Sequence, residues 1–347
     1  MLNRRQMLTT TLALGAMHLF PGISMGQARR LVFATFTGSW EEAHRDVLVP
    51  AFRKATNNAE MALDPMLSVD QIAKVTAARA NPPIDVMLHD PGPALVAIGQ
   101  DLAAPYPVAQ SAHYKDLISD AQDPMGPAPF FQVVGITYNP EKVKTPPTSW
   151  ADIWKPEFKG RVGITNLNST LGTGFLVEIA RMKGGSEANV DAGFKAIEDL
   201  KPNLGAVAAN PGQLATLYQQ GQVDIGPGNF NAIQILKARG VPVEFVAPKE
   251  GAIAFKTTIH IVKNSPNPEL AFKLIEASLS PEVQSKLMDS PYLIVPTNTK
   301  VKMGGEIAKV LAKDHDEMKK KFVFQDWKKI NEQRSGWIEK FNRDIKI

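Results

Sequence analysis

The run LVFATF at residues 31–36 begins a repeating pattern of buried strands and helices. Its residues are apolar and partly β-branched, which is typical of a strand covered on both faces. A helical pattern over Trp40–Thr56 follows, then a strand near Ala59–Leu63, a helix over Ser68–Ala80 and the apolar run IDVML at 84–88. Because strands that alternate with helices form parallel sheets, the sequence predicts an α/β fold with a largely parallel sheet.

A second strand–helix series begins after Thr148, and 347 residues suit two lobes better than one core. Two extended apolar segments, 130–138 and 243–259, are the expected crossings between these lobes. A chain that crosses twice makes each lobe discontinuous and leaves a hinge and a cleft. We therefore expect lobe one to contain residues 29–131 plus 256–347, and lobe two to contain residues 132–255.

Near the end of the chain, an apolar stripe at three- and four-residue spacing predicts an amphipathic helix. The stripe contains one arginine and consists of Trp327, Ile330, Arg334, Trp337, Ile338 and Phe341.

The N-terminal segment 1–28 has the pattern of an export signal. It contains Arg4 and Arg5 but no acid, then an apolar run of about ten residues, too short to cross a membrane, and small residues up to Ala28. The sequence NRRQML at residues 3–8 is similar to a twin-arginine signal, with methionine in place of the preferred phenylalanine. We expect cleavage near Ala28 and a periplasmic mature chain, with the twin-arginine route favoured over the general one.

Composition excludes several classes of function. The chain has no cysteine, which rules out disulfides, cysteine nucleophiles and cysteine-bound metals. Its net charge of +4 comes from the two arginines of the leader and from residues 301–347, which contain twelve Lys and Arg residues but only eight Asp and Glu residues. The body of the protein is therefore slightly acidic, and no nucleic-acid partner is expected. The six histidines are scattered, so no metal site or cofactor is expected either.

The richest polar stretch is TNLNSTLGTG at residues 165–174, between a predicted strand and a helix over 174–183. Hydroxyls, amides and free backbone N–H groups at the start of a helix suit a negatively charged group. Asn166, Ser169 and Thr170 are the candidate ligand contacts. A loop that merely caps the helix would need only one of these side chains, and this alternative stays open.

Other candidates lie at the ends of predicted strands. Asn229 closes the segment GPGN, which follows a predicted strand over 223–225. His89 and Asp90 end another strand and could belong to an exported enzyme, although no serine nucleophile can be assigned to them. Phe36, Trp40 and Phe255 could form aromatic walls, with plain core packing as the alternative for each.

The segment TSWADIWKPEFKG at residues 148–160 is specific. Together with GITYN at 135–139 and PKEG at 248–251, it resembles the extracellular solute-binding proteins of the spermidine/putrescine-binding type. This resemblance implies a monomeric, two-lobed periplasmic binding protein of type II that has no enzymatic activity or cofactor. Such a protein closes on a small solute and delivers it to the ABC permease of the inner membrane. A sensor that presents its ligand to a membrane receptor would share the fold.

Site residues follow from the resemblance where positions match. Phe36 and Thr37 match the aromatic residue and threonine after the first strand, and the loop at His89 and Asp90 matches the one after the third. The second-lobe loop that supplies carboxylates in polyamine binders has no acid here, and Thr257 stands where they have an aspartate after the aromatic residue. Because a buried diamine requires carboxylates, the sequence favours an anionic or zwitterionic solute, amino-acid-like or aminophosphonate-like, over putrescine or spermidine.

Overall fold

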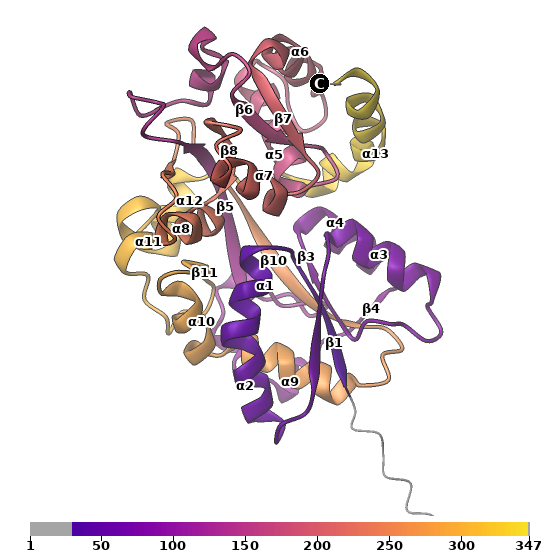
Figure 1. Ribbon diagram of the computed structural model, residues 1–347. Coiled ribbons are helices and arrows are strands. Elements are labelled where there is room, and N and C mark those ends of the chain that lie inside the picture. The colour runs from indigo at the N-terminus through magenta and orange to yellow at the C-terminus, as the bar shows by residue number, and fades with distance from the viewer. Residues whose placement is uncertain (1–29, 346–347) are drawn as a thin grey trace, which may run out of the picture.

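The computed structural model describes residues 30–345, so the expected export signal lies outside the described residues. It consists of two α/β lobes joined by long strands (Figure 1). The lower lobe contains β1 (Leu31–Thr35), α1 (Ser39–Ala43), α2 (Val49–Ala55), β2 (Met61–Pro65), α3 (Ser68–Ala77), β3 (Val86–His89), α4 (Pro91–Gly99), β4 (Ala103–Ala104), α9 (Pro268–Leu279) and α10 (Pro281–Met288).

The upper lobe is built from the second strand–helix series. It contains β6 (Val162–Thr165), α5 (Thr170–Met182), α6 (Asp191–Leu200), β7 (Leu204–Ala208), α7 (Pro211–Gln219), β8 (Ile225–Asn229) and α13 (Trp327–Asp344). The strands that join the lobes, and the elements packed beside them, are β5 (Phe130–Tyr138), α8 (Phe230–Ala238), β9 (Glu244–Val246), β10 (Ile253–Val262), β11 (Val295–Pro296), α11 (Gly305–Val310) and α12 (His315–Lys321).

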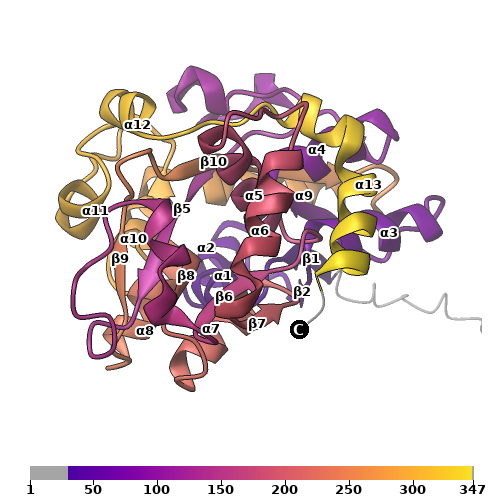
Figure 2. The same cartoon turned by 90° about the horizontal axis from the view of Figure 1, so that it is seen from above.

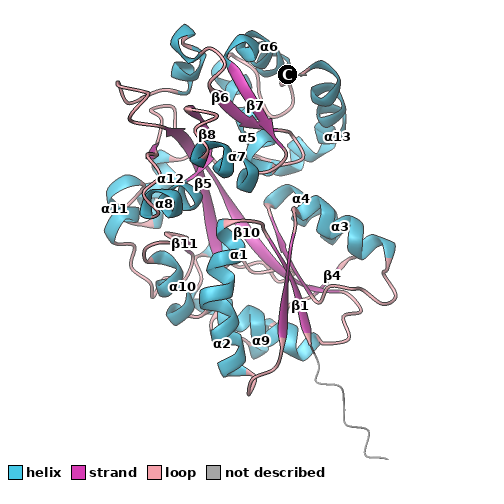
Figure 3. Ribbon diagram, in the orientation of Figure 1, coloured by secondary structure: helices cyan, strands magenta, loops and turns pink. Residues whose placement is uncertain are grey.

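β5 and β10 cross between the lobes, as Figure 3 shows. The first half of β10 pairs with β5, and its second half pairs with β3 of the lower lobe. The far half of β5 pairs with β8, which in turn adjoins β6 of the upper lobe. One sheet therefore runs through both lobes in the order β2-β1-β3-β10-β5-β8-β6-β7. The predicted crossing at 130–138 is confirmed to the residue. The second predicted crossing, over 243–259, consists of two strands, β9 and β10.

The expectation of a largely parallel sheet is correct only within the lobes. β1 pairs in parallel with β2 and β3, and β6 pairs in parallel with β7 and β8. Every pairing of β5 or β10 with another strand is antiparallel. The two crossing strands run in opposite directions because the chain goes up through one and returns through the other.

Two predicted element boundaries near the cleft were wrong. The strand predicted over 223–225 begins at Ile225 instead and runs through the glycines and proline to Asn229, paired with β5, and the glycines leave room for that pairing. A Cβ atom on Gly228 would lie 2.1 Å from Thr137 Oγ1. The helix predicted from Gly174 begins at Thr170 instead, and Gly172 makes this start possible by packing directly against the carbonyl of Asn166.

The C-terminal helix α13 does not follow the predicted division into lobes. Its apolar stripe joins the core of the upper lobe, although residues 256–347 were all expected in lobe one. Figures 1 and 2 show α13 beside α5 on the outside of that lobe. The same helix reaches the lower lobe, where Asn331 Nδ2 donates to the carbonyl of Gly92 on α4 at 2.7 Å. Helix α13 therefore contacts both lobes.

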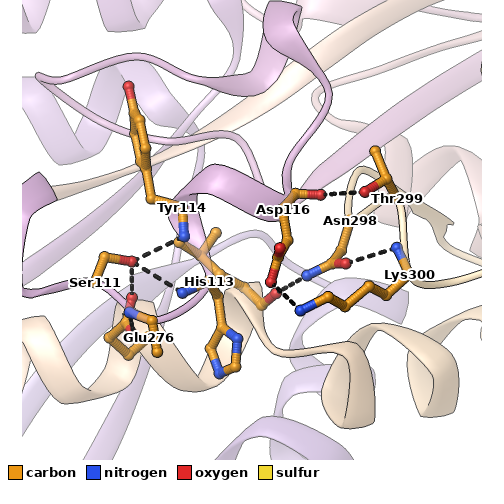
Figure 4. A network of polar contacts seen from close by, with 10 residues as sticks. Ser111, His113, Tyr114, Asp116, Glu276, Asn298, Thr299 and Lys300 are labelled. Carbon is orange, nitrogen blue, oxygen red and sulfur yellow. Dashed lines mark hydrogen bonds and ion pairs between the residues drawn. The ribbon is translucent and has the colours of Figure 1, made fainter.

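The lower lobe also holds a polar network that fixes a long loop (Figure 4). The carboxylate of Glu276 on α9 accepts hydrogen bonds from the Ser111 hydroxyl and from the Ala112 N–H. Nearby, Lys300 forms an ion pair with Asp116 at 2.6 Å. These bonds hold the loop before β5 against the rest of the lobe, so the start of the crossing strand is fixed in place.

Within residues 30–345, no helix is both long and apolar enough to traverse a bilayer.

Candidate functional site

A cavity of about 140 Å³ lies between the two lobes. This volume is below the few hundred cubic ångströms typical of sites for drug-sized ligands, so the cavity suits a small solute. Its walls come from the lower lobe, the upper lobe and the crossing strands. The predicted site residues that line it are Phe36, Thr37, Trp40, Asp90, Ser169, Thr170, Asn229 and Phe255. Their contact with a solute stays a prediction.

Aromatic rings form the lower-lobe wall of the cavity. Phe36 meets Trp40 edge to face, with ring centroids 6.0 Å apart, and Trp40 packs on Phe130 at 5.6 Å. Trp40 is only 4% exposed, and its indole Nε1 has no hydrogen-bond partner among the described residues. A buried indole N–H usually finds an acceptor, so this unpartnered donor on a cavity-lining residue marks a place where an acceptor is missing.

The start of α5 forms the opposite wall. Ser169 is the N-cap residue, yet its side chain makes no capping bond, and its buried Oγ lacks a partner in the described part of the chain. The first N–H groups of a helix have no acceptor within the helix, and they carry partial positive charge. The unpartnered hydroxyl and the helix end together offer several donors to a negatively charged group.

Gln132 on β5 links two further strands, β8 and β10, and the N-cap residue of α4 beside the cavity. Its Nε2 donates to Asp90 Oδ1 at 2.7 Å and to Thr257 Oγ1 at 2.9 Å. Its Oε1 accepts from Asn229 Nδ2 at 2.8 Å. This network leaves Asn229 Oδ1 unpartnered, which makes it the site's available neutral acceptor. The three bonds fix Gln132 relative to Asp90, Thr257 and Asn229.

Asp90 is the N-cap residue of α4 and reaches toward the upper lobe. Burial raises the pKa of this carboxyl from 3.8 to about 6. The Thr170 hydroxyl, the Arg334 guanidinium and the Gln132 amide each lower the pKa, but together they offset only part of the effect of burial. Asp90 is therefore a desolvated carboxyl that gains from a cationic partner.

The two lobes touch at the mouth of the cavity. Asn231 Nδ2 of α8 donates to Ser39 Oγ of α1 at 3.1 Å. Arg239, directly after α8, forms an ion pair with Glu42 of α1 at 2.5 Å. These contacts join α1 of the lower lobe to α8 and the residue after it, and the arrangement with these contacts made is called closed below.

Three predicted site residues do not line the cavity. Thr257 is fully buried behind it and acts through Gln132. Asn166 lines a neighbouring open groove of about 480 Å³, and its Oδ1 accepts from the Asn168 N–H. His89 is fully buried and packs on His260 with ring centroids 5.4 Å apart. Burial and His260 lower the pKa of His89, so its ring is neutral. Because successive residues of a strand point to opposite faces, His89 points away while Asp90 reaches the cavity.

This geometry agrees with the comparison to known proteins. Residues 81–333 match the family model of the bacterial extracellular solute-binding proteins. The chain belongs to this family. Among curated relatives, the spermidine/putrescine-binding periplasmic protein of Escherichia coli is 31% identical over 149 residues, and the match spans 41% of each chain. A Salmonella typhimurium protein, provisionally named as a 2-aminoethylphosphonate-binding periplasmic protein, is 26% identical over 64% of each chain.

Solved structures place this solute-binding protein in the type II periplasmic-binding-protein fold. The periplasmic binding protein AfuA of Actinobacillus pleuropneumoniae, solved with fructose-6-phosphate bound, superposes with a TM-score of 0.76. The alignment covers 92% of this chain and 99% of that one at 21% sequence identity. The predicted α/β, two-lobed fold class is thereby confirmed.

Acidic residues are scarce in the cleft of this solute-binding protein. Among the cavity-lining residues only Glu42 and Asp90 are acidic, and Glu42 is already paired with Arg239. The loop at residues 165–170 contributes no acid, as the sequence indicates. In the part of the chain that the structure describes, no three histidine or acidic side chains cluster as they would around a metal ion.

Sequence reasoning missed Gln132 and the role of Arg334. Gln132 stands in a strand whose nine residues are all buried, and a polar residue inside such an apolar run was an available signal. Arg334 interrupts the apolar stripe of α13 and is 6% exposed. Its position in the stripe was visible, but its partners in α5 and the preceding loop were not.

Proposed function

We propose that the protein is the substrate-binding component of an ABC importer, and that it captures a small zwitterionic solute with a phosphonate, phosphate or carboxylate group and an amine. The observation that carries this proposal is the pair of unpartnered donors, Trp40 Nε1 and Ser169 Oγ, that line one cavity at the start of α5. Both side chains are more than nine-tenths buried, so water does not compensate them.

The anionic group belongs at the α5 end of the cavity, and the amine belongs at Asp90. Helix N-termini and hydroxyl donors stabilise negative charge. A protonated amine beside Asp90 would restore the charge balance that burial disturbs at this carboxyl. Asn229 Oδ1 could accept a second hydrogen bond from the amine.

The same charges argue against putrescine and spermidine. Each carries an ammonium group at both ends, and Asp90 is the one cavity-lining acid without an ion-pair partner in the described structure. A second buried ammonium would face the positive end of α5. An unpaired buried charge destabilises the complex by roughly several kcal/mol, which is more than the stabilisation from a neutral hydrogen bond.

Transport would work by hinge closure. The solute bridges lobes that rest on the crossing strands β5 and β10, and it shifts the protein toward the closed arrangement. The permease in the inner membrane would then recognise the closed form. We also propose that the mature chain begins near residue 29, is exported by the twin-arginine route and is a monomer in the periplasm. In the division into lobes that we propose, α13 belongs with lobe two.

Titration calorimetry on residues 29–347 tests the substrate class. The probes are 2-aminoethylphosphonate, phosphoethanolamine and β-alanine, with putrescine as the matched dication. We expect at least one zwitterion to bind with micromolar or tighter affinity and putrescine to bind at least tenfold more weakly. Tight putrescine binding without a response to any zwitterion would overturn the substrate class.

The same titrations separate binding from catalysis. A binding protein returns its solute unchanged after denaturation, whereas an exported enzyme would convert it. The geometry favours binding, because the ring of His89 points away from the cavity and cannot work with Asp90 on one solute. Mass spectrometry of the released solute distinguishes the two.

A further inference from the structure

Arg334 is the only lysine or arginine in the described part of the chain that is buried. It lies midway along α13, within the apolar stripe that packs into the upper lobe. Its guanidinium carbon is 5.7 Å from the centre of the Trp327 ring, which stabilises a cation. A buried charge at this place is costly, so its surroundings must compensate it.

No carboxylate lies within ion-pairing distance of Arg334 among residues 30–345. The guanidinium instead donates from Nε to Thr173 Oγ1 at 3.1 Å, and from Nη2 to the carbonyls of Leu167 at 3.2 Å and Asn168 at 3.0 Å. Neutral oxygens accept from Nε and Nη2 but leave the positive charge of the guanidinium uncancelled. The acid whose pKa responds to this charge is Asp90, at the start of α4 in the lower lobe.

The bonds to Leu167 and Asn168 also orient the loop that leads into α5. In a trans peptide the C=O and N–H groups point in opposite directions. Because the Asn168 carbonyl faces Arg334, the N–H of Ser169 faces away from it. Ser169 lines the cavity, whereas Arg334 does not. This orientation therefore turns the Ser169 N–H away from α13. The hydroxyl of the same residue is also unpartnered.

We propose that Arg334 is a positioning residue of the solute site, which fixes the loop before α5 in its donor-outward form and supplies the positive charge that selects an anionic group. This inference rests on the proposed function, since it assigns the anion end of the same site. It adds that the selectivity of the cleft depends on a residue of the C-terminal helix that the solute does not touch.

The test compares Arg334→Lys with Arg334→Gln in the chain 29–347. The lysine variant keeps the charge and the glutamine variant keeps an amide donor without charge, so the pair separates charge from hydrogen bonding. We expect Arg334→Gln to weaken binding of 2-aminoethylphosphonate by about tenfold or more, and Arg334→Lys to weaken it by no more than about threefold. Equal losses in both variants, accompanied by equal falls in melting temperature, would reduce Arg334 to a structural residue.

A second readout needs no solute. The pKa of Asp90, followed by carbon NMR of labelled aspartate and assigned with Asp90→Asn, should rise in Arg334→Gln and stay near its wild-type value in Arg334→Lys. An Asp90 pKa that is unchanged in Arg334→Gln overturns the electrostatic role, whatever the substrate is. If the pKa shifts as expected while every anionic probe fails to bind, the proposed substrate class fails and the role of Arg334 stands.

Discussion

Substitution of Asp90 by asparagine should favour closure of the empty protein. Asp90 lies in the lower lobe, burial raises its pKa, and Thr170 and Arg334 of the upper lobe act on its carboxylate. When the lobes separate, the carboxylate returns to water. Asparagine has nearly the same shape and can still accept the hydrogen bond from Gln132, but it has no charge to desolvate.

The size of the effect follows from the pKa of Asp90 in the closed arrangement. A rise from 3.8 to about 6 corresponds to at most about 3 kcal/mol at neutral pH, at about 1.4 kcal/mol for each pKa unit. Because this pKa is raised in the closed form, closure takes up a proton, and falling pH favours it from about 6 down to about 4. At pH 7.5, Asp90→Asn should therefore raise the ratio of closed to open protein by one to two orders of magnitude, roughly.

Distances between spin labels provide the assay, since a chain without cysteine can be labelled at two introduced sites. Lys54 on α2 and Lys195 on α6 are exposed and belong to different lobes. The wild type should shift toward the short distance between pH 7.5 and pH 5, and Asp90→Asn should show the short distance at both. The buried rings of His44, His89 and His260 also have lowered pKa values, but Asp90→Asn leaves them in place. Identical distance distributions in the two proteins at pH 7.5 would refute the reasoning.

Three further substitutions follow from individual contacts. Ser169→Ala should weaken 2-aminoethylphosphonate binding by about tenfold in calorimetry, without a change in melting temperature, because it removes one buried donor; equal affinity would place the anion elsewhere. Glu42→Gln removes the exposed ion pair with Arg239, which contributes less than about 1 kcal/mol. The affinity for 2-aminoethylphosphonate in calorimetry should therefore fall by no more than about fivefold, and the difference from the wild type should vanish in high salt. Gly172→Ala would bring a Cβ atom within 2.2 Å of the Asn166 carbonyl, so it should cost about 1–3 kcal/mol in urea unfolding, and an unchanged midpoint would contradict the close packing of the α5 start.

The sequence predicted the fold where hydrophobic pattern alone determines structure. The strand–helix alternation and the crossing segment 130–138 follow from apolar runs, and the structure agrees with them. β8 was cut short because glycine and proline ordinarily end strands, whereas here Gly228 is needed for the close approach of β5. The helix that starts at Thr170 was predicted to start too late for a related reason. Gly172 packs on the carbonyl of Asn166, and the hydrophobic pattern gives no sign of this contact.

The candidate site was predictable as single positions but not as a network. Strand ends and the polar loop pointed to Asp90, Ser169 and Asn229, which all line the cavity. Gln132 joins two of them through bonds between strands that are distant in sequence, and no local pattern specifies such pairing. Arg334 follows Asn168 by more than 160 residues, so only the packing of α13 reveals which carbonyls it holds.

A crystal structure of the protein with 2-aminoethylphosphonate tests the central claim most directly. The phosphonate should lie within hydrogen-bonding distance of Trp40 Nε1 and Ser169 Oγ, at the start of α5, and the amine should lie beside Asp90. A phosphonate at Asp90 with the amine at α5, or a cleft that remains empty at saturating concentrations, would contradict it.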